Sequence, residues 1–255
     1  MRNVLAITGR ELRAYFASPI AYFVVGFFAF LFGWFFWSYL VLFARQSMQM
    51  GQFGASGSMN VNQMMIRPLL LNTSVMVLFF LPMITMRTFS EEKRSGTFEL
   101  LLTSPLTDFQ IVMGKFLGAL CLYALMLLVS LASLGLLFVY GRPEWRQIAS
   151  SYVGLLLMGG SFISIGLFFS SLTKNQIVAI VLTFATLLFL WIINWAGDQA
   201  GPVVRAVVNA LSITDHFDDF SKGVIDTKHV IYYLSFITFG LFLTAKSVDS
   251  ERWRG

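Results

Sequence analysis

The chain has 255 residues, of which 57% are apolar and 12% are charged, and its formal net charge is +5. Soluble domains carry about a quarter charged residues, so this composition excludes an ordinary soluble domain and favours a membrane protein. In a membrane protein, a modest positive charge helps to set the topology and can attract anionic lipid headgroups. We expect no nucleic-acid partner.

The first 19 residues predict an amphipathic helix that lies on the membrane surface. At about 100° per residue, its apolar side chains fall within one arc and its arginines on the opposite side. The apolar set is Val4, Leu5, Leu12, Tyr15 and Phe16, and the basic set is Arg2, Arg10 and Arg13. Ser18 and Pro19 then turn the chain into the first apolar run.

Six runs without any charged residue follow. Most reach the roughly 20 residues that cross a hydrocarbon core as a helix, and backbone groups inside lipid must be satisfied within their own segment. We therefore predict an all-α membrane protein with a single transmembrane domain over residues 1–255. The predicted spans are 20–43, 68–86, 116–140, 152–172, 177–195 and 230–245.

The basic residues of the connections predict the orientation. Six spans place both termini on one side, which holds eleven of the 18 Lys and Arg residues, against seven on the other side. The side richer in Lys and Arg normally faces the cytoplasm. We expect a multi-pass protein of the bacterial cytoplasmic (inner) membrane with both termini in the cytoplasm.

Two long connections face outward in this topology. The first, 44–67, is rich in Gly, Ser, Gln and Met and fits either a flexible loop or a loose helical extension. The second, 196–229, contains Pro202 followed by apolar residues at helical spacing. It predicts a pair of short helices that dips against the outer leaflet.

The segment 88–105 is a charged stretch between the second and third spans. Thr88 with Glu91 has the spacing of a capping box, Gly96 can stop a helix, and Thr97 can start a second one that Pro105 ends. Thr107 with Gln110 is another capping-box pair. The pattern predicts a short amphipathic element on the cytoplasmic side, with Phe98, Leu100, Leu101 and Leu102 against the bundle; the alternative is a plain charged loop.

The run EEKRSGTFELLLTSPLTDFQIVMGK resembles the signature loop E-x-x-x-G-T-x-E-x-L-L-x-x-P of type-2 ATP-binding-cassette (ABC) permeases. The matching residues are Glu92, Gly96, Thr97, Glu99, Leu101, Leu102 and Pro105. The opening RELRAYFASPIAYF and the stretch NALSITDHFDDFSKGVIDTKHVIYYLS are similar to the gliding-motility-type branch, whose relatives include the permease of nitrous oxide reductase maturation.

The resemblance implies a permease subunit of an ATP-driven transporter, with export as the expected direction. Two ABC ATP-binding subunits would hold ATP and Mg, and a second permease copy or paralogue would complete the path, with room for an accessory periplasmic or membrane subunit. In that family the segment 88–105 is the coupling element. Its predicted ATPase-coupling residues are Glu91, Glu92, Gly96, Thr97, Phe98, Glu99 and Pro105.

Absent motifs argue against catalysis by this chain. The sequence has no G-x-x-x-x-G-K-[ST] phosphate loop, so ATP hydrolysis is expected in a separate subunit and no cofactor in this one. The six runs lack the charged residues that ion-driven carriers keep in the membrane. A metal site using His216 with Asp218 or Asp219 competes with a solvated surface, which the flanking acids favour. No catalytic or metal residue is predicted.

Two alternatives to a transporter remain open at this stage. One is a membrane anchor or scaffold of an ATPase-driven cell-surface machine, and the other is an intramembrane enzyme, for which no nucleophile with a nearby base is evident. Polar residues inside the spans fit hydrogen bonding between helices. Asn72 and Asn194 lie on the second and fifth spans, which face the dimer seam in the resembled family, and are path-lining candidates.

Overall fold

The computed structural model describes residues 2–52, 60–103, 105–140, 143–197 and 201–252. Parts of five predicted features lie outside these residues. They are residue 1 of the segment 1–19, 53–59 of the connection 44–67, 104 of the segment 88–105, 198–200 of the loop 196–229, and Arg142 and Arg254 of the charge count.

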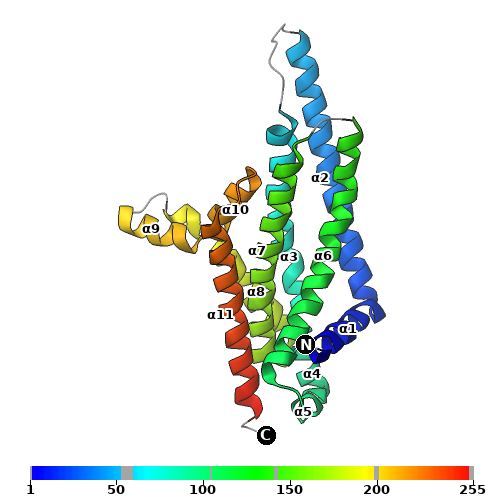
Figure 1. Ribbon diagram of the computed structural model, residues 1–255, viewed down its shortest axis with the longest axis vertical. Helices are drawn as coiled ribbons and strands as arrows, with labels where there is room; N and C mark the ends of the chain where they lie inside the picture. Colours follow the sequence, from blue (N-terminus) through cyan, green and yellow to red (C-terminus); the bar gives the residue numbers. More distant parts are fainter. Residues whose placement is uncertain (1, 53–59, 104, 141–142, 198–200, 253–255) are drawn as a thin grey trace.

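Every regular element in the described ranges is a helix, so the all-α fold class is confirmed. Six helical segments in these ranges are long and apolar enough to cross a bilayer. They contain α2 (Pro19–Gln52), α3 (Arg67–Thr85), α6 (Asp108–Tyr140), α7 (Trp145–Leu172), α8 (Gln176–Gly197) and α11 (Thr227–Arg252). Figure 1 shows them as a long bundle with α1 (Arg2–Ala17) crossing one end.

The connection 44–67 is in part helical. α2 continues as far as Gln52, and a single π-helical turn, η1 (Asn62–Ile66), leads directly into α3. The helical-extension alternative therefore holds for residues 44–52. Asn62 fixes η1 to the start of α7, because its side chain donates to Gln147 Oε1 at 3.0 Å and accepts from the Glu144 backbone N–H at 3.0 Å.

α7 is the central helix of the bundle. It packs against α3, α6, α8 and α11 and is mostly buried, whereas α8 and α11 are mostly exposed. Small residues allow these close approaches. A Cβ on Gly240 of α11 would lie 2.8 Å from Ser164 Cβ, and one on Gly159 would lie 2.1 Å from the Tyr123 ring. A larger residue at either position would force the facing side chain or its helix to shift.

The outward connection 196–229 contains two short helices, α9 (Pro202–Leu211) and α10 (Ile213–Ser221). α10 packs into the bundle instead of resting on it: Phe217 and Phe220 are buried, and the Phe220 carbonyl accepts hydrogen bonds from Ser150 and Ser151 of α7. α9 projects sideways from the bundle in Figure 1. The pair therefore forms one docked helix and one projecting helix.

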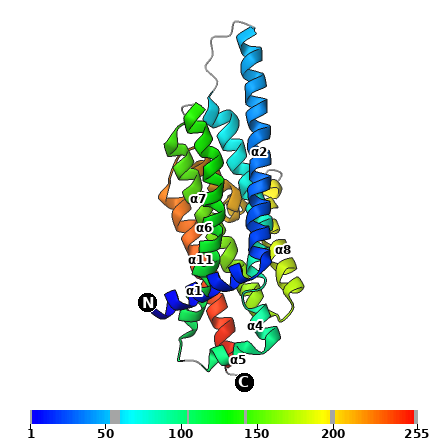
Figure 2. The same ribbon diagram turned by 90° about the vertical axis from the view of Figure 1, so that its right-hand side faces the viewer.

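The charged segment lies at one end of the bundle. It folds into two short helices, α4 (Ser90–Ser95) and α5 (Thr97–Leu102), between the end of α3 and the start of α6. α1 and the end of α11 lie at this same end, as both views show (Figures 1 and 2). We call this the hairpin end and the α4–α5 pair the hairpin.

Candidate functional site

Gly96 makes the turn of the hairpin. Its φ is 75°, a left-handed backbone conformation that L side chains rarely adopt, and it lies between the end of α4 and the start of α5. The predicted stop at Gly96 and restart at Thr97 agree with these helix bounds. Residue type and backbone geometry agree here because glycine reaches this conformation at little steric cost.

The inner face of the hairpin is anchored by aromatic and ionic contacts. Phe98 is buried, and its ring meets Phe89 edge to face at 6.2 Å. Lys93 lies over the Phe98 ring at 5.2 Å and pairs with Glu251 of α11 at 3.0 Å. The hairpin is therefore attached to the end of α11 as well as to the helices beside it in sequence.

The outer face of the hairpin is exposed and carries most of the predicted coupling residues. Glu91, Gly96, Thr97, Glu99 and Pro105 all lie on the surface. Leu100 was expected against the bundle but is 72% exposed, because the short helix α5 turns Phe98 and Leu101 inward and Leu100 outward. An exposed leucine beside acidic residues gives this face an apolar contact point that the sequence pattern had placed inside.

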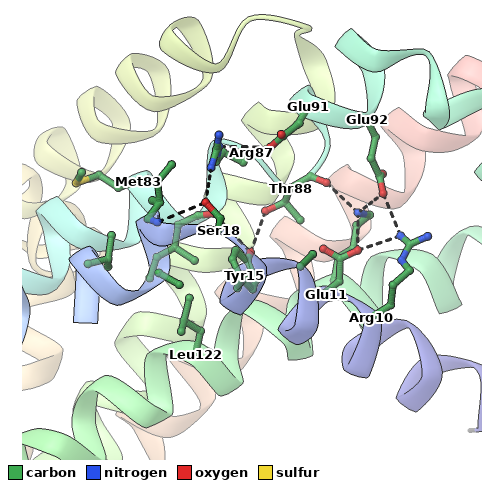
Figure 3. A pocket seen from close by; sticks show the side chains of 16 residues that line it. Arg10, Glu11, Tyr15, Ser18, Met83, Arg87, Thr88, Glu91, Glu92 and Leu122 are labelled. Atoms are coloured by element: carbon green, nitrogen blue, oxygen red, sulfur yellow. Dashed lines mark hydrogen bonds and ion pairs between the residues drawn. The ribbon is translucent and has the colours of Figure 1, made fainter. Parts of the chain in front are cut away.

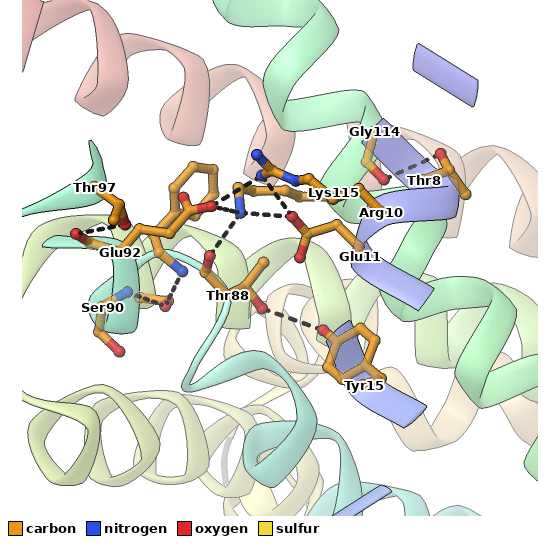
Figure 4. A network of polar contacts seen from close by, with 12 residues as sticks. Thr8, Arg10, Glu11, Tyr15, Thr88, Ser90, Glu92, Thr97, Gly114 and Lys115 are labelled. Atoms are coloured by element: carbon orange, nitrogen blue, oxygen red, sulfur yellow. Dashed lines mark hydrogen bonds and ion pairs between the residues drawn. The ribbon is translucent and has the colours of Figure 1, made fainter. Parts of the chain in front are cut away.

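Two of the predicted coupling residues point inward. Phe98 fills the anchor described above, and Glu92 takes part in a buried network of ions (Figure 4). One oxygen of the Glu92 carboxylate accepts from Lys115 at 2.9 Å and from Arg10 at 3.0 Å. The structure gives Glu92 two cationic partners within the chain, and its contact with an ATPase stays a prediction.

Lys115 is the centre of this network. Its side chain is 1% exposed, and its ammonium group lies 3.0 Å from Glu11 of α1, 2.9 Å from Glu92 of α4 and 2.9 Å from the Thr88 carbonyl. The Phe89 ring covers it at 5.1 Å. A buried ammonium group is tolerated where its protons are all bonded, and here the three acceptors lie on three different segments. Lys115 thus joins α1, the hairpin and α6.

The sequence patterns missed both Lys115 and Glu11 as members of the site. They assign Lys115 only to the balance of basic residues and give Glu11 no role. A signal did exist, since Glu11 is the only acidic residue before Glu91 and Lys115 immediately precedes the third predicted span. An isolated acid on a basic helix and a lone lysine at a span end are together a reason to expect an ion pair.

α1 is close-packed on α6 at this point. The Thr8 hydroxyl donates to the Gly114 carbonyl at 3.2 Å, and Ile7 covers Gly114 so closely that a Cβ there would lie 2.6 Å from Ile7 Cβ. Burial disfavours the charged form of Arg10, but hydrogen bonds and Coulomb attraction to Glu11 and Glu92 outweigh it and raise the Arg10 pKa. Arg10 therefore carries its positive charge at physiological pH.

Only one of the two predicted capping boxes forms. Thr107 and Gln110 exchange side-chain hydrogen bonds with each other's backbone N–H at 3.3 and 3.4 Å. The prediction of a capping box at Thr88 and Glu91 was wrong, because α4 begins at Ser90 without a side-chain cap. The Thr88 hydroxyl instead lies 3.5 Å from the Tyr15 hydroxyl of α1, and its carbonyl is taken by Lys115.

The two path-lining candidates lie on one pocket. Asn72 of α3 and Asn194 of α8 both line a cavity of about 290 Å³, together with Trp191 and Thr214. Asn72 donates to the Tyr39 hydroxyl at 2.8 Å, and Asn194 donates to Asp215 at 2.6 Å. The structure thus places the two amides, 122 positions apart in sequence, on one pocket between α3, α8 and α10.

His216 is buried, so the expectation of a solvated surface around it was wrong. Its Nδ1 lies 2.8 Å from the Ser212 carbonyl, and its ring stacks on Tyr232 at 3.8 Å. Asp218 pairs with Arg67 and Lys222, and Asp219 pairs with His229 at 2.9 Å. These contacts fasten α10 to α3 and α11. No group of three or more metal-ligating side chains occurs in the described ranges.

These features define a multi-pass, all-helical membrane protein with a charged helical hairpin at one end of its bundle. The family described as ABC-2 family transporter protein matches residues 46–195, and the chain belongs to this family. The matched range contains the hairpin and the helices α3, α6, α7 and α8. It supports a permease of the ABC transporter class, and the gliding-motility-type branch remains a prediction.

Two curated relatives carry the name "Probable multidrug ABC transporter permease YbhR", one from Escherichia coli strain K12 and one from E. coli O157:H7. Each is 31% identical to this chain over 146 residues, which is 55% of this chain and 38% of the relative. The match thus spans less than half of the length of these relatives, and their activity is not transferred to this chain.

Proposed function

We propose that this chain is the membrane-spanning permease subunit of an ATP-driven exporter. Separate ATP-binding subunits would dock on the hairpin and drive its conformational changes. Membership of the ABC-2 family supports the permease class. The observation that carries the docking role is the two-sided hairpin, whose inner face is anchored by Phe98 and Lys93 and whose outer face exposes Glu99 and Leu100.

The Lys115 network gives the hairpin a connection to the bundle beyond its chain ends. A displacement of α4 pulls on Glu92, and through Lys115 it reaches α6 and α1. α3 and α6 follow directly because they flank the hairpin in sequence. ATP binding can shift the bundle only if its partner subunits bind the two conformations with different affinities.

The proposed path runs past the pocket of Asn72 and Asn194. Both amides are partly buried and hydrogen-bonded within the chain, and they give polar groups to a pocket that is otherwise largely apolar. A second copy or a paralogue of this chain would complete the path. ATP and Mg would be bound by the partner subunits, since the sequence has no phosphate loop.

Co-purification tests the docking role. The chain is expressed with its ATP-binding subunit, and the variant Glu99→Lys/Leu100→Asp is compared with the parent. Losing a charged contact and an apolar contact at an interface centre is expected to lower recovery of the ATPase about tenfold or more. Glu144→Lys is the matched control, because Glu144 is exposed near the start of α7, at the other end of the bundle.

Unchanged recovery of the ATPase with the double variant would contradict docking on this face. Loss of recovery with Glu144→Lys as well would show a general defect in the folded protein. Stimulation of ATP hydrolysis by a transported compound, measured in the reconstituted complex, separates a transporter from a membrane anchor that binds the same ATPase without moving cargo.

A further inference from the structure

A cavity of about 360 Å³ lies at the hairpin end, between α1 and the ends of α2, α3 and α6 (Figure 3). Its apolar wall is formed by Ile20, Ala21, Val24, Ile84 and Leu122. Its polar wall carries three cationic and three anionic side chains, namely Arg10, Arg87 and Lys115, and Glu11, Glu91 and Glu92. The cavity is therefore amphipathic, and its formal charge is balanced.

Two polar atoms on this cavity remain without a hydrogen bond although both are buried. One is the donor Arg87 Nε, and the other is the second carboxylate oxygen of Glu92. Arg87 Nε lies 3.3 Å from the Glu91 carboxylate without a hydrogen bond, and the other Glu92 oxygen already serves Lys115 and Arg10. Arg87 is thus ion-paired with Glu91, whereas the second Glu92 oxygen is a buried anionic acceptor that lacks a hydrogen bond, which is unusual because buried polar groups are normally satisfied.

The cavity lies at headgroup depth. The first span begins at Pro19 and the charge-free run of the second ends at Met86, so the residues lining the cavity straddle the ends of two spans. Tyr22 and Phe23 follow directly on α2 and are 61% and 63% exposed, as expected for residues in contact with lipid. A ligand of this site needs an amine that donates to Glu92 and apolar chains that cover the apolar wall, and an anionic group on it can share Arg87 with Glu91.

We propose that the cavity binds an aminophospholipid of the phosphatidylethanolamine class from the leaflet at the hairpin end. Its phosphate is bound by Arg87, beside the Ser18 hydroxyl that lies 3.5 Å from the Arg87 guanidinium. Its ammonium group donates to the free oxygen of Glu92, and its acyl chains lie along Ile20 and Val24. Charge-assisted hydrogen bonds at both ends of the headgroup give selectivity for this zwitterion.

Other headgroups fit the same cavity less well. A phosphatidylcholine headgroup has no N–H to donate to Glu92, and a phosphatidylglycerol headgroup has no cation. The proposal concerns a resident lipid that ties α1 to α2 and α3. It holds whether or not the chain exports a substrate, so its failure would leave the proposed function standing.

Native mass spectrometry of the purified full-length chain tests the proposal. The chain is exchanged into detergent containing equal amounts of phosphatidylethanolamine, phosphatidylcholine and phosphatidylglycerol with identical acyl chains. We expect phosphatidylethanolamine to be retained about tenfold over each of the others, a ratio that one charge-assisted hydrogen bond can supply. Glycerophosphoethanolamine, which lacks acyl chains, is expected to compete at least about tenfold less well because it leaves the apolar wall uncovered.

Three variants locate the site. Arg87→Gln and Glu92→Gln each remove one charged partner and are expected to abolish the preference, while Ala14→Trp fills the cavity from α1 and is expected to abolish retention without removing a charge. The matched controls are Arg94→Gln and Glu99→Gln, which are exposed on the same hairpin and do not line the cavity. Equal retention of the three lipids, or a preference that survives Ala14→Trp with both charge variants, would overturn the proposal.

Discussion

Lys115 illustrates how one residue can join three segments. An ammonium group that leaves water loses several kcal/mol of hydration free energy, and Coulomb attraction compensates for this only when the partners are close and every proton is bonded. Lys115 meets that condition with two carboxylates and a backbone carbonyl within 3.0 Å. The cost of burying the Lys115 ammonium group is compensated only while α1 and the hairpin remain in place.

Replacing Lys115 with methionine is therefore expected to destabilise the protein strongly. The substitution keeps the volume but leaves Glu11 and Glu92 to share Arg10 as their cationic partner. Breaking a buried ion pair in this way costs about 3 kcal/mol or more. The measurement is the midpoint of thermal unfolding of the detergent-purified chain, which we expect to fall by several degrees.

A double substitution separates loss of the ion pair from loss of packing. Glu11→Gln added to Lys115→Met removes one of the two stranded carboxylates and is expected to recover part of the lost stability. Lys246→Met is the control, because Lys246 is 65% exposed in its side chain and its removal should change the free energy of unfolding by no more than about 0.5 kcal/mol. A Lys115→Met protein as stable as the parent would refute the network's role.

His216 predicts a pH dependence for the docking of α10. Burial lowers the His216 pKa below its ordinary value of 6.5, and His229 and Lys228 of α11 act in the same direction, while the hydrogen bond to the Ser212 carbonyl and the charge of Asp219 oppose them. The folded state therefore binds fewer protons than the unfolded state below pH 6.5. Stability contributed by neutral His216 is complete above that pH and is lost as the pH falls toward the lowered pKa.

Hydrogen exchange of the α10 backbone at pH 7.5 and pH 5.5, corrected for the intrinsic rates, measures this effect. We expect less protection at the lower pH in the parent protein. His216→Phe keeps a ring against Tyr232 but removes the titrating group, so its protection should no longer change between the two values. His229→Gln should retain the change, and an unaltered pH response in His216→Phe would refute the assignment.

At the scale of elements, α1 docks on α6 through two glycines one helical turn apart. A Cβ on Gly118 would lie 2.8 Å from Glu11 Cβ, and one on Gly114 would meet Ile7 at 2.6 Å. Glu11 lies within this close contact, so the fit of the two helices places its carboxylate beside Lys115. The packing of α1 against α6 therefore also forms the ion pair between Glu11 and Lys115.

Gly118→Ala is expected to displace α1. The added methyl group overlaps Glu11, and overpacking of this kind costs about 1–3 kcal/mol. Gly135→Ala on the same helix is the matched control, because nothing lies within 4 Å of the position that its Cβ would take and alanine favours helix by about 1 kcal/mol or less. Hydrogen exchange should rise in α1 for the first variant only, and equal behaviour of the two would contradict the close packing.

The sequence was sufficient for the helices whose limits depend on local chemistry. Gly96 and the Thr107–Gln110 pair act through their own backbone, so residue type alone predicted the turn and the cap. Thr88 has the same cap spacing, but Tyr15 and Lys115 take its polar groups. Contacts with residues distant in sequence replace the local cap at Thr88. A sequence pattern that spans only a few residues cannot reveal such contacts.

α1 shows the same limit on a larger scale. The predicted apolar arc includes Leu5 and Phe16, which are indeed exposed on the molecule's surface at 67% and 36%. The face that meets α6 is instead Ile7, Thr8 and Glu11. That this helix lies on the membrane stays a prediction. Amphipathic patterning assigns a carboxylate to water and cannot find a partner lysine 104 positions away.

At the scale of the whole molecule, the charge-free runs were enough to predict six spans and an all-helical bundle. The membrane favours helices here, because the backbone of an apolar run inside lipid must form its hydrogen bonds within the run itself. The position of α10 was not predictable in the same way. Its acids and histidine suggest a solvated surface, yet His216, Phe217 and Phe220 are buried, and α10 packs against α7.

The orientation of the bundle is the property on which the docking proposal depends most. The hairpin end carries α1, the hairpin and the end of α11, and eleven of the 18 basic residues were assigned to that side from the sequence. Several of them are paired in the folded state, such as Lys115 with Glu11 and Lys93 with Glu251. Spans are oriented during insertion, before these pairs form, so the count of basic residues is the relevant quantity.

Thiol labelling tests this orientation directly. In a Cys121→Ser background, Ser95→Cys places a thiol on the exposed turn of the hairpin, and Glu144→Cys places one near the start of α7 at the opposite end. With a membrane-impermeant maleimide, we expect Glu144→Cys to react in intact spheroplasts and Ser95→Cys to react only in inverted membrane vesicles. The reverse pattern would put the hairpin outside the cell, where no ATP-binding subunit could reach Glu99 and Leu100, and the proposed mechanism would be wrong.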